Sequence, residues 1–288
     1  MSPRAKLLVV ALAGLNALLL FIWILRPRTR EDRARELRAE KLQPHFEELK
    51  VRETPWVDPD PRRPLERRHE PGATFKEYVS WDPPRPVARR SAIDLQPLGD
   101  FTAEQRKLIE LAAEFLRRVS KIEVRVRGPQ PLPEVTRRMN GGRAQVLAPE
   151  LEEKLATRVA GDSLGLMAVL AVGLYPRPSW NYLFYDVDAQ VAVASLQELG
   201  DPAASPAAFR LALARTLKIE LQQLLSLLSI PRCYAYECMN NPSDGLEDLD
   251  RQPLHLCPAC LQKLCWNLSC DPQQMLQSAA AFLSENGL

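Results

Sequence analysis

Six cysteines give this chain its clearest chemical signature, because four of them form two closely spaced pairs. Four residues separate Cys233 from Cys238, and eighteen residues further on, two residues separate Cys257 from Cys260. Pairs at C-x4-C and C-x2-C joined by a polar loop are typical of a four-thiolate zinc site. Four thiolates complete the tetrahedral shell of Zn²⁺, so such a site is closed and structural. Spacing alone leaves one alternative open, which is two disulfides or scattered core cysteines.

The other residues that bind transition metals do not suggest a second site. Cys265 and Cys270 lie outside the two pairs, and we interpret them as buried thiols. The three histidines of the chain are far apart in the sequence, at His45, His69 and His255. His255 lies inside the loop of the cysteine site, but it would have to displace a cysteine in order to bind the metal. A catalytic zinc site made of several imidazoles is therefore hard to assemble from this chain.

A long apolar helix is predicted to lead directly into the first cysteine pair. Ser205 and Pro206 are typical of a helix start, and residues 206–230 then read PAAFRLALARTLKIELQQLLSLLSI before Pro231 stops the helix. Upstream of this helix, residues 174–184 read LYPRPSWNYLF.

These stretches resemble the archaemetzincins, a family of zinc metallopeptidases. In that family a Leu-Tyr-Pro-x-x-Ser-Trp-Asn segment precedes a helix with HExxHxxGxxHC, which leads into C-x4-C, an eighteen-residue loop and C-x2-C. The resemblance covers about residues 92–268. It implies an α/β fold with a metzincin-like mixed twisted sheet, a long active-site-type helix and a C-terminal module, residues 230–264, clamped by one structural zinc ion.

The same resemblance implies that the catalytic zinc site has been lost. Aligned back from Cys233, the three zinc-binding histidines of the family fall on Gln222, Ser226 and Arg232, and the general-base glutamate falls on Gln223. A carboxamide and a hydroxyl bind zinc far more weakly than imidazoles, and Arg232 places a permanent positive charge at the third ligand position. Gln223 cannot accept a proton at neutral pH. The resemblance therefore implies that these positions are vestigial and that no catalytic residue remains.

Three neighbouring positions complete the comparison with the family motif. The motif glycine falls on Ser229, and the methionine of the family's Met-turn falls on Asn240, next to Met239. Glu220 lies within one helical turn of Gln223 but points in a different helical direction. We interpret Glu220 as a solvated or linker-facing acid rather than as a replacement base.

The N-terminal residues 7–25 are apolar except for Asn16. As a helix these nineteen residues would be about 28 Å long, close to the thickness of a bilayer core. The prediction is a single-pass transmembrane helix, because a small-x-small cleavage site, typical of a signal peptide, is missing after it. The many arginines that follow the span favour the cytoplasmic face for the rest of the chain. The short basic N-terminus favours the opposite orientation.

Residues 26–91 are predicted to form a charged, proline-rich stalk or linker. A weak helical pattern runs through residues 30–53, and nine prolines follow between Pro55 and Pro97. Proline favours extended backbone, so we expect a semi-rigid tether. Four aromatic residues could dock this tether onto the domain, although we favour a solvated one: Trp56, Phe75, Tyr78 and Trp81.

The remaining residues, 92–288, are predicted to form the archaemetzincin-like domain. Thr102 can cap a helix, Asn140-Gly141-Gly142 is typical of a turn, and the apolar run 164–174 is typical of a central strand covered on both faces. Helices are expected at 102–119, 149–158, 206–230 and 272–285, and strands at 92–99, 121–127, 143–147, 164–174, 182–187 and 190–197. By resemblance, the last two strands form the sheet edge that holds an extended peptide in metzincins.

The leading functional hypothesis is a membrane-anchored, catalytically inactive protein with one structural zinc ion that binds peptide or protein ligands. An active zinc metallopeptidase with unorthodox ligands is the alternative, and a membrane-anchored structural protein without a ligand is a third. The net charge of +2 excludes no function class. A nucleic-acid-binding zinc finger is disfavoured, because the loop between the cysteine pairs carries four acids that repel phosphate: Asp244, Glu247, Asp248 and Asp250.

Overall fold

The computed structural model describes residues 30–50, 53–57, 72–180, 185–188 and 190–288. The chain divides into two compact units, Met1–Leu42 and Gln43–Leu288. Helix α2 (Arg30–Lys50) begins in the first unit, in agreement with the weak helical pattern of the sequence. All further elements belong to the second unit.

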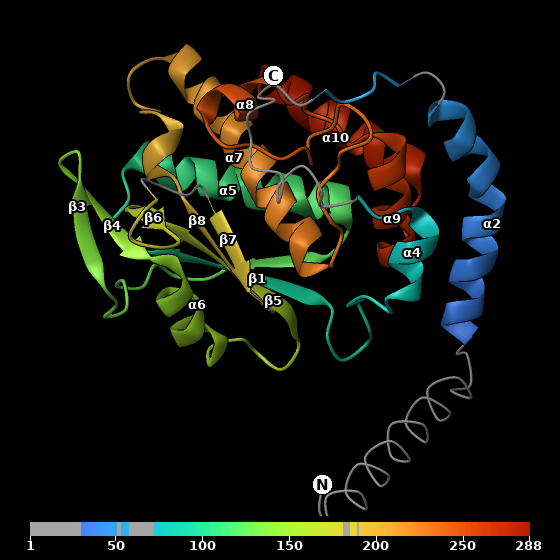
Figure 1. Cartoon of the computed structure of the whole chain (residues 1–288), viewed down its shortest axis with the longest axis horizontal. Helices are drawn as coiled ribbons and strands as arrows, with labels where there is room; N and C mark the ends of the chain where they lie inside the picture. The colour runs from blue at the N-terminus through green and yellow to red at the C-terminus, as the bar shows by residue number, and fades with distance from the viewer. Residues whose placement is uncertain (1–29, 51–52, 58–71, 181–184, 189) are drawn as a thin grey trace, which may run out of the picture. The chain divides into compact units, whose positions relative to one another are not determined.

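A five-stranded mixed sheet forms the centre of the second unit (Figure 1). Four of its strands are parallel, and the edge strand β7 runs antiparallel to β8. This arrangement confirms the predicted mixed α/β class. It also places β8 inside the sheet, so that β7 alone forms the predicted edge. In spatial order the strands are β2 (Glu123–Val126), β1 (Ala92–Leu98), β5 (Ser163–Leu170), β8 (Val191–Ser195) and β7 (Tyr185–Asp188).

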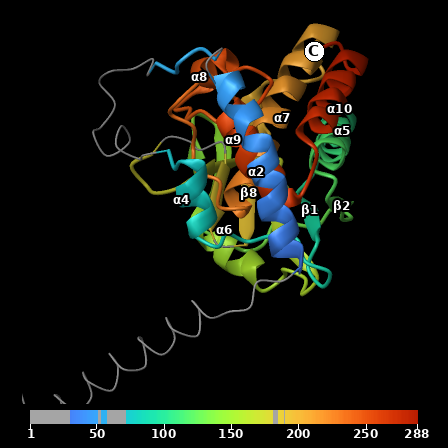
Figure 2. The same cartoon turned by 90° about the vertical axis from the view of Figure 1, so that its right-hand side faces the viewer.

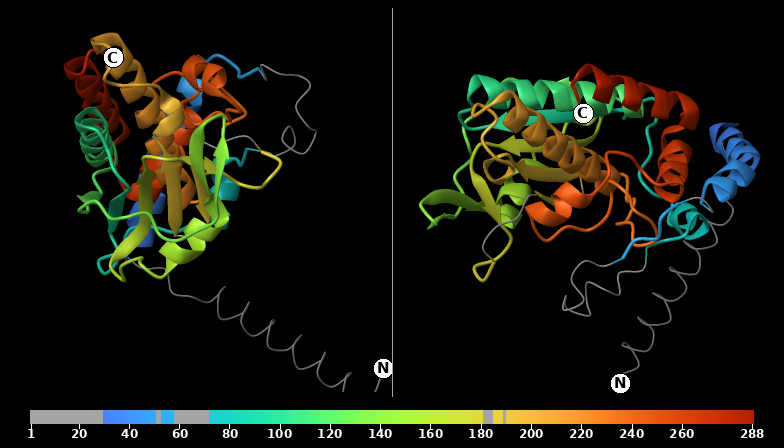
Figure 3. Two further views of the ribbon diagram at one scale, coloured as in Figure 1. Left: turned by 90° about the vertical axis from the view of Figure 1, so that its left-hand side faces the viewer. Right: turned by 90° about the horizontal axis from the view of Figure 1, so that it is seen from above.

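A second, three-stranded sheet consists of β3 (Arg137–Asn140), β4 (Arg143–Leu147) and β6 (Gly173–Tyr175). Its β3–β4 hairpin is seen from the side in Figure 3. Gly141 and Gly142 have φ values of 56° and 78° at the tip of this hairpin. Positive φ at both positions is the backbone of a type I′ turn, which glycine adopts without steric cost. The predicted turn is confirmed.

The prediction of one strand over residues 164–174 is wrong, because the chain passes from one sheet to the other within it. Strand β5 ends at Leu170, and β6 begins at Gly173 and pairs in parallel with β4. A Cβ at Gly173 would lie 2.7 Å from Nε2 of Gln197, so a side chain here would clash with its neighbours. The break lies inside an uninterrupted apolar run, and hydrophobic periodicity therefore gives no sign of it.

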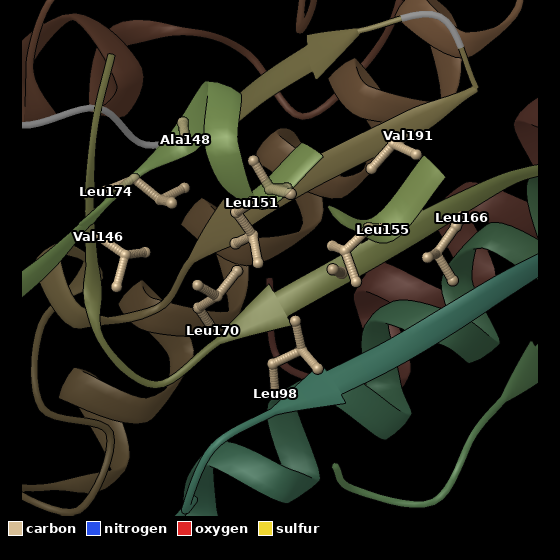
Figure 4. Close-up of a cluster of buried hydrophobic side chains, with 11 residues drawn as sticks. Leu98, Val146, Ala148, Leu151, Leu155, Leu166, Leu170, Leu174 and Val191 are labelled. Atoms are coloured by element: carbon tan, nitrogen blue, oxygen red, sulfur yellow. The ribbon is translucent and has the colours of Figure 1, made fainter. Parts of the chain in front are cut away.

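Helices cover both faces of the five-stranded sheet (Figure 1). On one face lie α5 (Ala103–Ser120) and α7 (Pro206–Leu227), and on the other lies α6 (Ala148–Ala156). As predicted, Thr102 caps α5, with its hydroxyl accepting a hydrogen bond from the backbone N–H of Gln105. Figure 4 shows the core between α6 and the strands, where Leu151 and Leu155 are fully buried. Burial of one such side chain stabilises the fold by about 2 kcal/mol.

Three helices make up the C-terminal part: α8 (Leu246–Arg251), α9 (Pro258–Leu268) and α10 (Pro272–Glu285). The predicted helix α10 lies alongside α5 (Figure 2), and the rings of Phe115 and Phe282 meet there with centroids 5.3 Å apart. The short helices α8 and α9 were not expected from the sequence. Helix α9 begins with Pro258 directly after Cys257, so it positions the second cysteine pair.

The interpretation of residues 72–91 as a solvated tether is wrong, because a short helix there docks on the domain. Helix α4 (Phe75–Ser80) has a complete capping box between Thr74 and Glu77. The buried Tyr78 hydroxyl donates to the carbonyl oxygen of Leu228 at 2.9 Å and accepts from Nδ2 of Asn267 at 2.7 Å. The contact joins chain segments about 150 residues apart, which local sequence patterns do not reveal.

The predicted single-pass membrane localisation is contradicted. Across the described ranges, the structure contains no helix with both the length and the apolar character needed to span a bilayer. Helix α7, with 22 residues, contains four charged side chains within its apolar sequence: Arg210, Arg215, Lys218 and Glu220. The predicted span, residues 7–25, lies outside the described residues.

Candidate metal centre

The four cysteines predicted as zinc ligands come together in one buried cluster. Cys233 and Cys238 lie in the loop that follows α7, Cys257 is the N-cap of α9, and Cys260 lies in its first turn. Their four Sγ atoms all lie within 4.8 Å of one another. All four are free thiols and no side chain among them is more than 4% exposed.

The geometry of the cluster fits one zinc ion. In a tetrahedral site with Zn–S bonds of about 2.3 Å, neighbouring sulfur atoms are about 3.8 Å apart. Sγ of Cys233 lies 3.6 Å from Sγ of Cys257. That separation is far longer than a disulfide bond of about 2.05 Å, so the alternative of two disulfides does not describe this structure. The four cysteines could hold one zinc ion.

The electrostatics of the cluster also suit a cation. Hydrogen bonds from the neighbouring thiols lower the pKa of Cys233, and the one with Cys238 has the largest effect. Burial raises the pKa of Cys238. Backbone N–H groups of Asn240 and Cys257 donate to Sγ of Cys238 at 3.4 and 3.2 Å. A bound zinc ion would supply the positive charge that keeps four buried thiolates ionised together.

The remaining candidate ligands lie outside this cluster. The His255 side chain is exposed, and its backbone carbonyl oxygen accepts a hydrogen bond from Met239 N at 2.8 Å. Cys265 is buried as predicted, whereas Cys270 is only half-buried. Within the described residues, the four cysteines are the one group of three or more His, Cys, Asp or Glu side chains arranged to hold a metal ion.

Gln222, at the first position predicted to be vestigial, is buried and hydrogen-bonded within the protein. Its Nε2 donates to the carbonyl oxygen of Met239 at 2.6 Å and to Oε1 of Gln252 at 2.9 Å. Gln252 in turn donates to the carbonyl oxygen of Asn241 at 2.7 Å. The carboxamide of Gln222 thus fastens α7 to the loop that carries the cysteines. Sequence reasoning did not identify Gln252, because thirty residues separate it from Gln222.

Arg232, also predicted to be at a vestigial position, lies with Asn240 between the cysteine cluster and the sheet edge. Nη1 of Arg232 donates to Oδ1 of Asn240 at 2.9 Å, and the guanidinium carbon lies 4.9 Å from the ring centroid of Tyr185 in β7. Asn240, at the expected Met-turn position, donates through Nδ2 to the carbonyl oxygen of Pro231 at 2.8 Å. Ser226 Oγ donates to the carbonyl oxygen of Gln222, at 2.9 Å.

Two polar side chains of α7 are buried without hydrogen bonds to any described residue. They are Gln223, which is 0% exposed, and Glu220, which is 1% exposed. Burial raises the pKa of Glu220 from 4.5 to about 8. The interpretation of Glu220 as a solvated acid is therefore wrong, because α7 is packed against the sheet and α5 over most of its circumference.

A buried lysine anchors the loop between the cysteine pairs. Nζ of Lys218 donates to the carbonyl oxygen of Leu249 at 2.7 Å, near the end of α8. Desolvation lowers the pKa of Lys218 to about 8. One turn earlier, Arg215 binds both carboxylate oxygens of Asp250, at 2.8 and 2.6 Å. Sequence reasoning missed both residues, although basic side chains within a largely apolar helix were a signal that acceptors lie nearby.

In sequence, the chain is similar to archaemetzincin-2 proteins. No protein-family profile matches the chain. Archaemetzincin-2 from Homo sapiens is 24% identical over 248 residues, and that from Macaca fascicularis is 23% identical over the same length. In both cases the match covers 73% of this chain, and the chain spans 66% of the length of these curated relatives.

A solved structure supports the likeness at the level of the fold. The crystal structure of archaemetzincin from Methanopyrus kandleri superposes with a TM-score of 0.52 at 22% identity, covering 64% of this chain and 99% of that one. Together with the Leu-Tyr-Pro and cysteine stretches, these similarities bear out the resemblance seen in the sequence. In sequence and in fold, the chain is archaemetzincin-like.

Proposed function

We propose that this chain is a non-catalytic archaemetzincin-like protein that holds one structural zinc ion and binds peptide or protein segments. The proposal keeps the scaffold of the archaemetzincins and gives up their hydrolytic chemistry. It includes no nucleic-acid partner, because the loop between the cysteine pairs is acidic.

One observation carries the loss of catalysis. Metzincin chemistry needs three neutral imidazoles around zinc and a carboxylate that deprotonates the bound water. Here the side chains at the corresponding positions take part in the protein's own contacts, with Gln222 bound to Met239 and Arg232 bound to Asn240. Around one zinc ion the four cysteines would form a closed shell, which would leave no coordination position for water or substrate.

The edge of the five-stranded sheet supports the binding half of the proposal. Strand β7 is the last strand in the sheet order, and among the described strands it pairs with β8. An exposed strand edge can pair with an extended peptide through backbone hydrogen bonds. Tyr185 begins this strand, and Arg232 at a vestigial motif position stacks on its ring.

A peptidase assay with a built-in positive control tests the loss of catalysis. The zinc-loaded chain is incubated with a library of unstructured peptides, with and without chelator, and we expect no chelator-sensitive cleavage. The control is a variant with Gln222→His, Gln223→Glu, Ser226→His and Arg232→His, which we expect to take up a second zinc ion. Chelator-sensitive cleavage by the unaltered chain that disappears in Gln222→Ala would overturn the non-catalytic assignment.

Hydrogen–deuterium exchange tests the binding half separately. A bound extended peptide should slow exchange of the backbone amides of β7 and leave those of β2, at the opposite edge of the sheet, unchanged. If none of the peptides protects β7, the peptide-binding part of the proposal is wrong.

A further inference from the structure

Three arginine side chains stack on aromatic rings of the segment that leads into the edge strand. Arg138 lies over Tyr175 at 3.9 Å, Arg177 over Trp180 at 5.0 Å, and Arg232 over Tyr185 at 4.9 Å, measured from the guanidinium carbon to the ring centroid. The three rings lie within eleven consecutive positions of the chain, 175–185. We call these six residues the arginine–aromatic strip.

Arg138 fixes the shape of the first part of this strip. From strand β3 it donates through Nη1 to the carbonyl oxygen of Pro178 at 2.8 Å, and through Nη2 to that of Trp180. The turn is closed by a hydrogen bond from Trp180 N to the carbonyl oxygen of Arg177, at 3.0 Å. The Trp180 ring and the arginine stacked on it are therefore held at a defined place on the surface.

Arg177 supplies an accessible charge in the strip. Its side chain is exposed, and no described residue forms a hydrogen bond or an ion pair with it. A guanidinium stacked on an aromatic ring keeps its planar N–H edge directed outward, where it can bind a carboxylate with two parallel hydrogen bonds. Stacking also restricts the side chain before a ligand arrives, which reduces the entropy lost on binding.

Arg232 supplies the second charge, directly beside the sheet edge. It is half-buried and is oriented by both Asn240 and the Tyr185 ring. Five residue steps join Trp180 to Tyr185, so their Cα atoms are at most about 18 Å apart. Asp188 of β7 is exposed and lies three residues after Tyr185. Because side chains alternate between the two faces of a strand, the Asp188 side chain and the Tyr185 ring lie on opposite faces.

We propose that the arginine–aromatic strip selects acidic peptide segments, with carboxylates placed to reach Arg177 and Arg232 while the peptide lies along β7. The inference rests on the proposed peptide-binding function and adds the chemical class of the ligand. A segment of about six extended residues spans the maximum separation of the Trp180 and Tyr185 Cα atoms. Nucleic acid is the less suitable ligand, because it needs a broad basic surface and the whole chain has a net charge of only +2.

Fluorescence anisotropy with matched peptides tests the proposal on the full-length, zinc-loaded chain. A labelled nine-residue peptide rich in Glu and Asp is compared with the same peptide carrying Gln and Asn at those positions. We expect the acidic peptide to bind at least tenfold more tightly, with an affinity that falls as salt is added. Arg177→Gln should weaken binding of the acidic peptide three- to tenfold and leave binding of the amide peptide unchanged.

The control variant Lys154→Gln removes one exposed positive charge on α6, which covers the opposite face of the sheet from α7, and it should leave both affinities unchanged. Arg177 is exposed, so its variant is expected to fold, and a thermal melt checks this. Equal binding of the two peptides would overturn this inference and leave the proposed function standing. No binding of either peptide would overturn both. Tighter binding of a single-stranded oligonucleotide than of the acidic peptide would overturn the choice of a peptide ligand.

Discussion

At the scale of single residues, the buried Glu220 makes the stability of this protein depend on pH. Its pKa is 4.5 when exposed and about 8 in the fold, so the folded state holds a proton that the unfolded state releases between these values. The contribution of protonated Glu220 to the free energy of unfolding is complete below pH 4.5 and is lost as the pH rises toward 8. The loss over this window amounts to about 5 kcal/mol at most.

Replacing Glu220 with Gln should remove this pH dependence. We expect the free energy of unfolding of the unaltered chain to fall by several kcal/mol between pH 5 and pH 8, and that of Glu220→Gln to change much less. Denaturant titrations at a series of pH values measure both. Glu153→Gln, which changes an exposed glutamate of α6, serves as control and should keep the profile of the unaltered chain. Identical profiles for the unaltered chain and Glu220→Gln would contradict the prediction.

At the same scale, Ser229 has a backbone conformation that favours glycine. The residue follows the end of α7 with a φ of 56°, in the left-handed region. Glycine adopts this conformation without strain, whereas a serine Cβ is disfavoured there. The backbone at Ser229 therefore suits glycine better than the serine that occupies this position.

Ser229→Gly should therefore stabilise the chain by about 0.5–1 kcal/mol. Ser278→Gly is the matched control, because Ser278 lies in the interior of α10, where the same replacement should destabilise by about 1 kcal/mol. Chemical denaturation measures the free energy of unfolding of both variants. Changes of the same sign would show that the positive φ at Ser229 does not favour glycine.

At the scale of elements, helix α4 is attached to the domain mainly through Tyr78. Its buried hydroxyl links the end of α7 to α9, through Leu228 and Asn267. The rings of Tyr78 and Trp266 also meet nearly edge-on, with centroids 5.9 Å apart. Desolvation raises the pKa of Tyr78 well above its ordinary value, so the hydroxyl stays protonated and can donate.

Tyr78→Phe should destabilise the chain by about 1–2 kcal/mol, because the ring still packs but the carbonyl oxygen of Leu228 loses its donor. Proteolysis within residues 72–91 should become faster as α4 detaches more often. The control is Tyr236→Phe, which removes a hydroxyl that has no hydrogen bond to any described residue. It should change neither the stability of the chain nor the rate of proteolysis within residues 72–91. Unchanged stability and proteolysis in Tyr78→Phe would show that packing alone holds α4.

At the scale of the whole molecule, the zinc cluster ties α7, the loop and α9 together. Metal binding to such clusters is coupled to folding, because the ligands converge only in the folded chain. Cys238→Ser should therefore lose the zinc ion and destabilise the region from residue 230 onward. Cys270→Ser is the control, since this half-buried thiol lies outside the cluster, and it should retain one zinc ion.

Elemental analysis with X-ray absorption measures both the number of zinc ions and their neighbours. We expect one zinc ion per chain with sulfur ligands only, in the unaltered chain and in Gln222→Ala alike. Two zinc ions per chain, or nitrogen atoms in the coordination shell, would contradict the loss of the catalytic site. A chain free of zinc would contradict the closed cysteine site itself.

Features that a few neighbouring residues encode could be predicted before the structure was known. The spacing of the cysteine pairs identified the cluster, Thr102 marked the start of α5, and the two glycines after Asn140 marked the hairpin. The assignment of the altered motif positions, aligned back from the first cysteine pair, stays a prediction. Such signals are local, since caps, turns and ligand spacings depend on chain geometry over a few residues.

Tertiary structure alone decided which polar side chains are buried and which segments dock. Glu220 looked like an exposed acid on a helix, but the helix is covered by the sheet and by α5. The apolar run through 164–174 looked like one strand, but its last residues pair with β4. Tyr78 contacts Leu228, and Arg232 contacts Tyr185, across long stretches of sequence. Burial and docking depend on the partners that the folded chain brings together, and those partners leave no pattern in the local sequence.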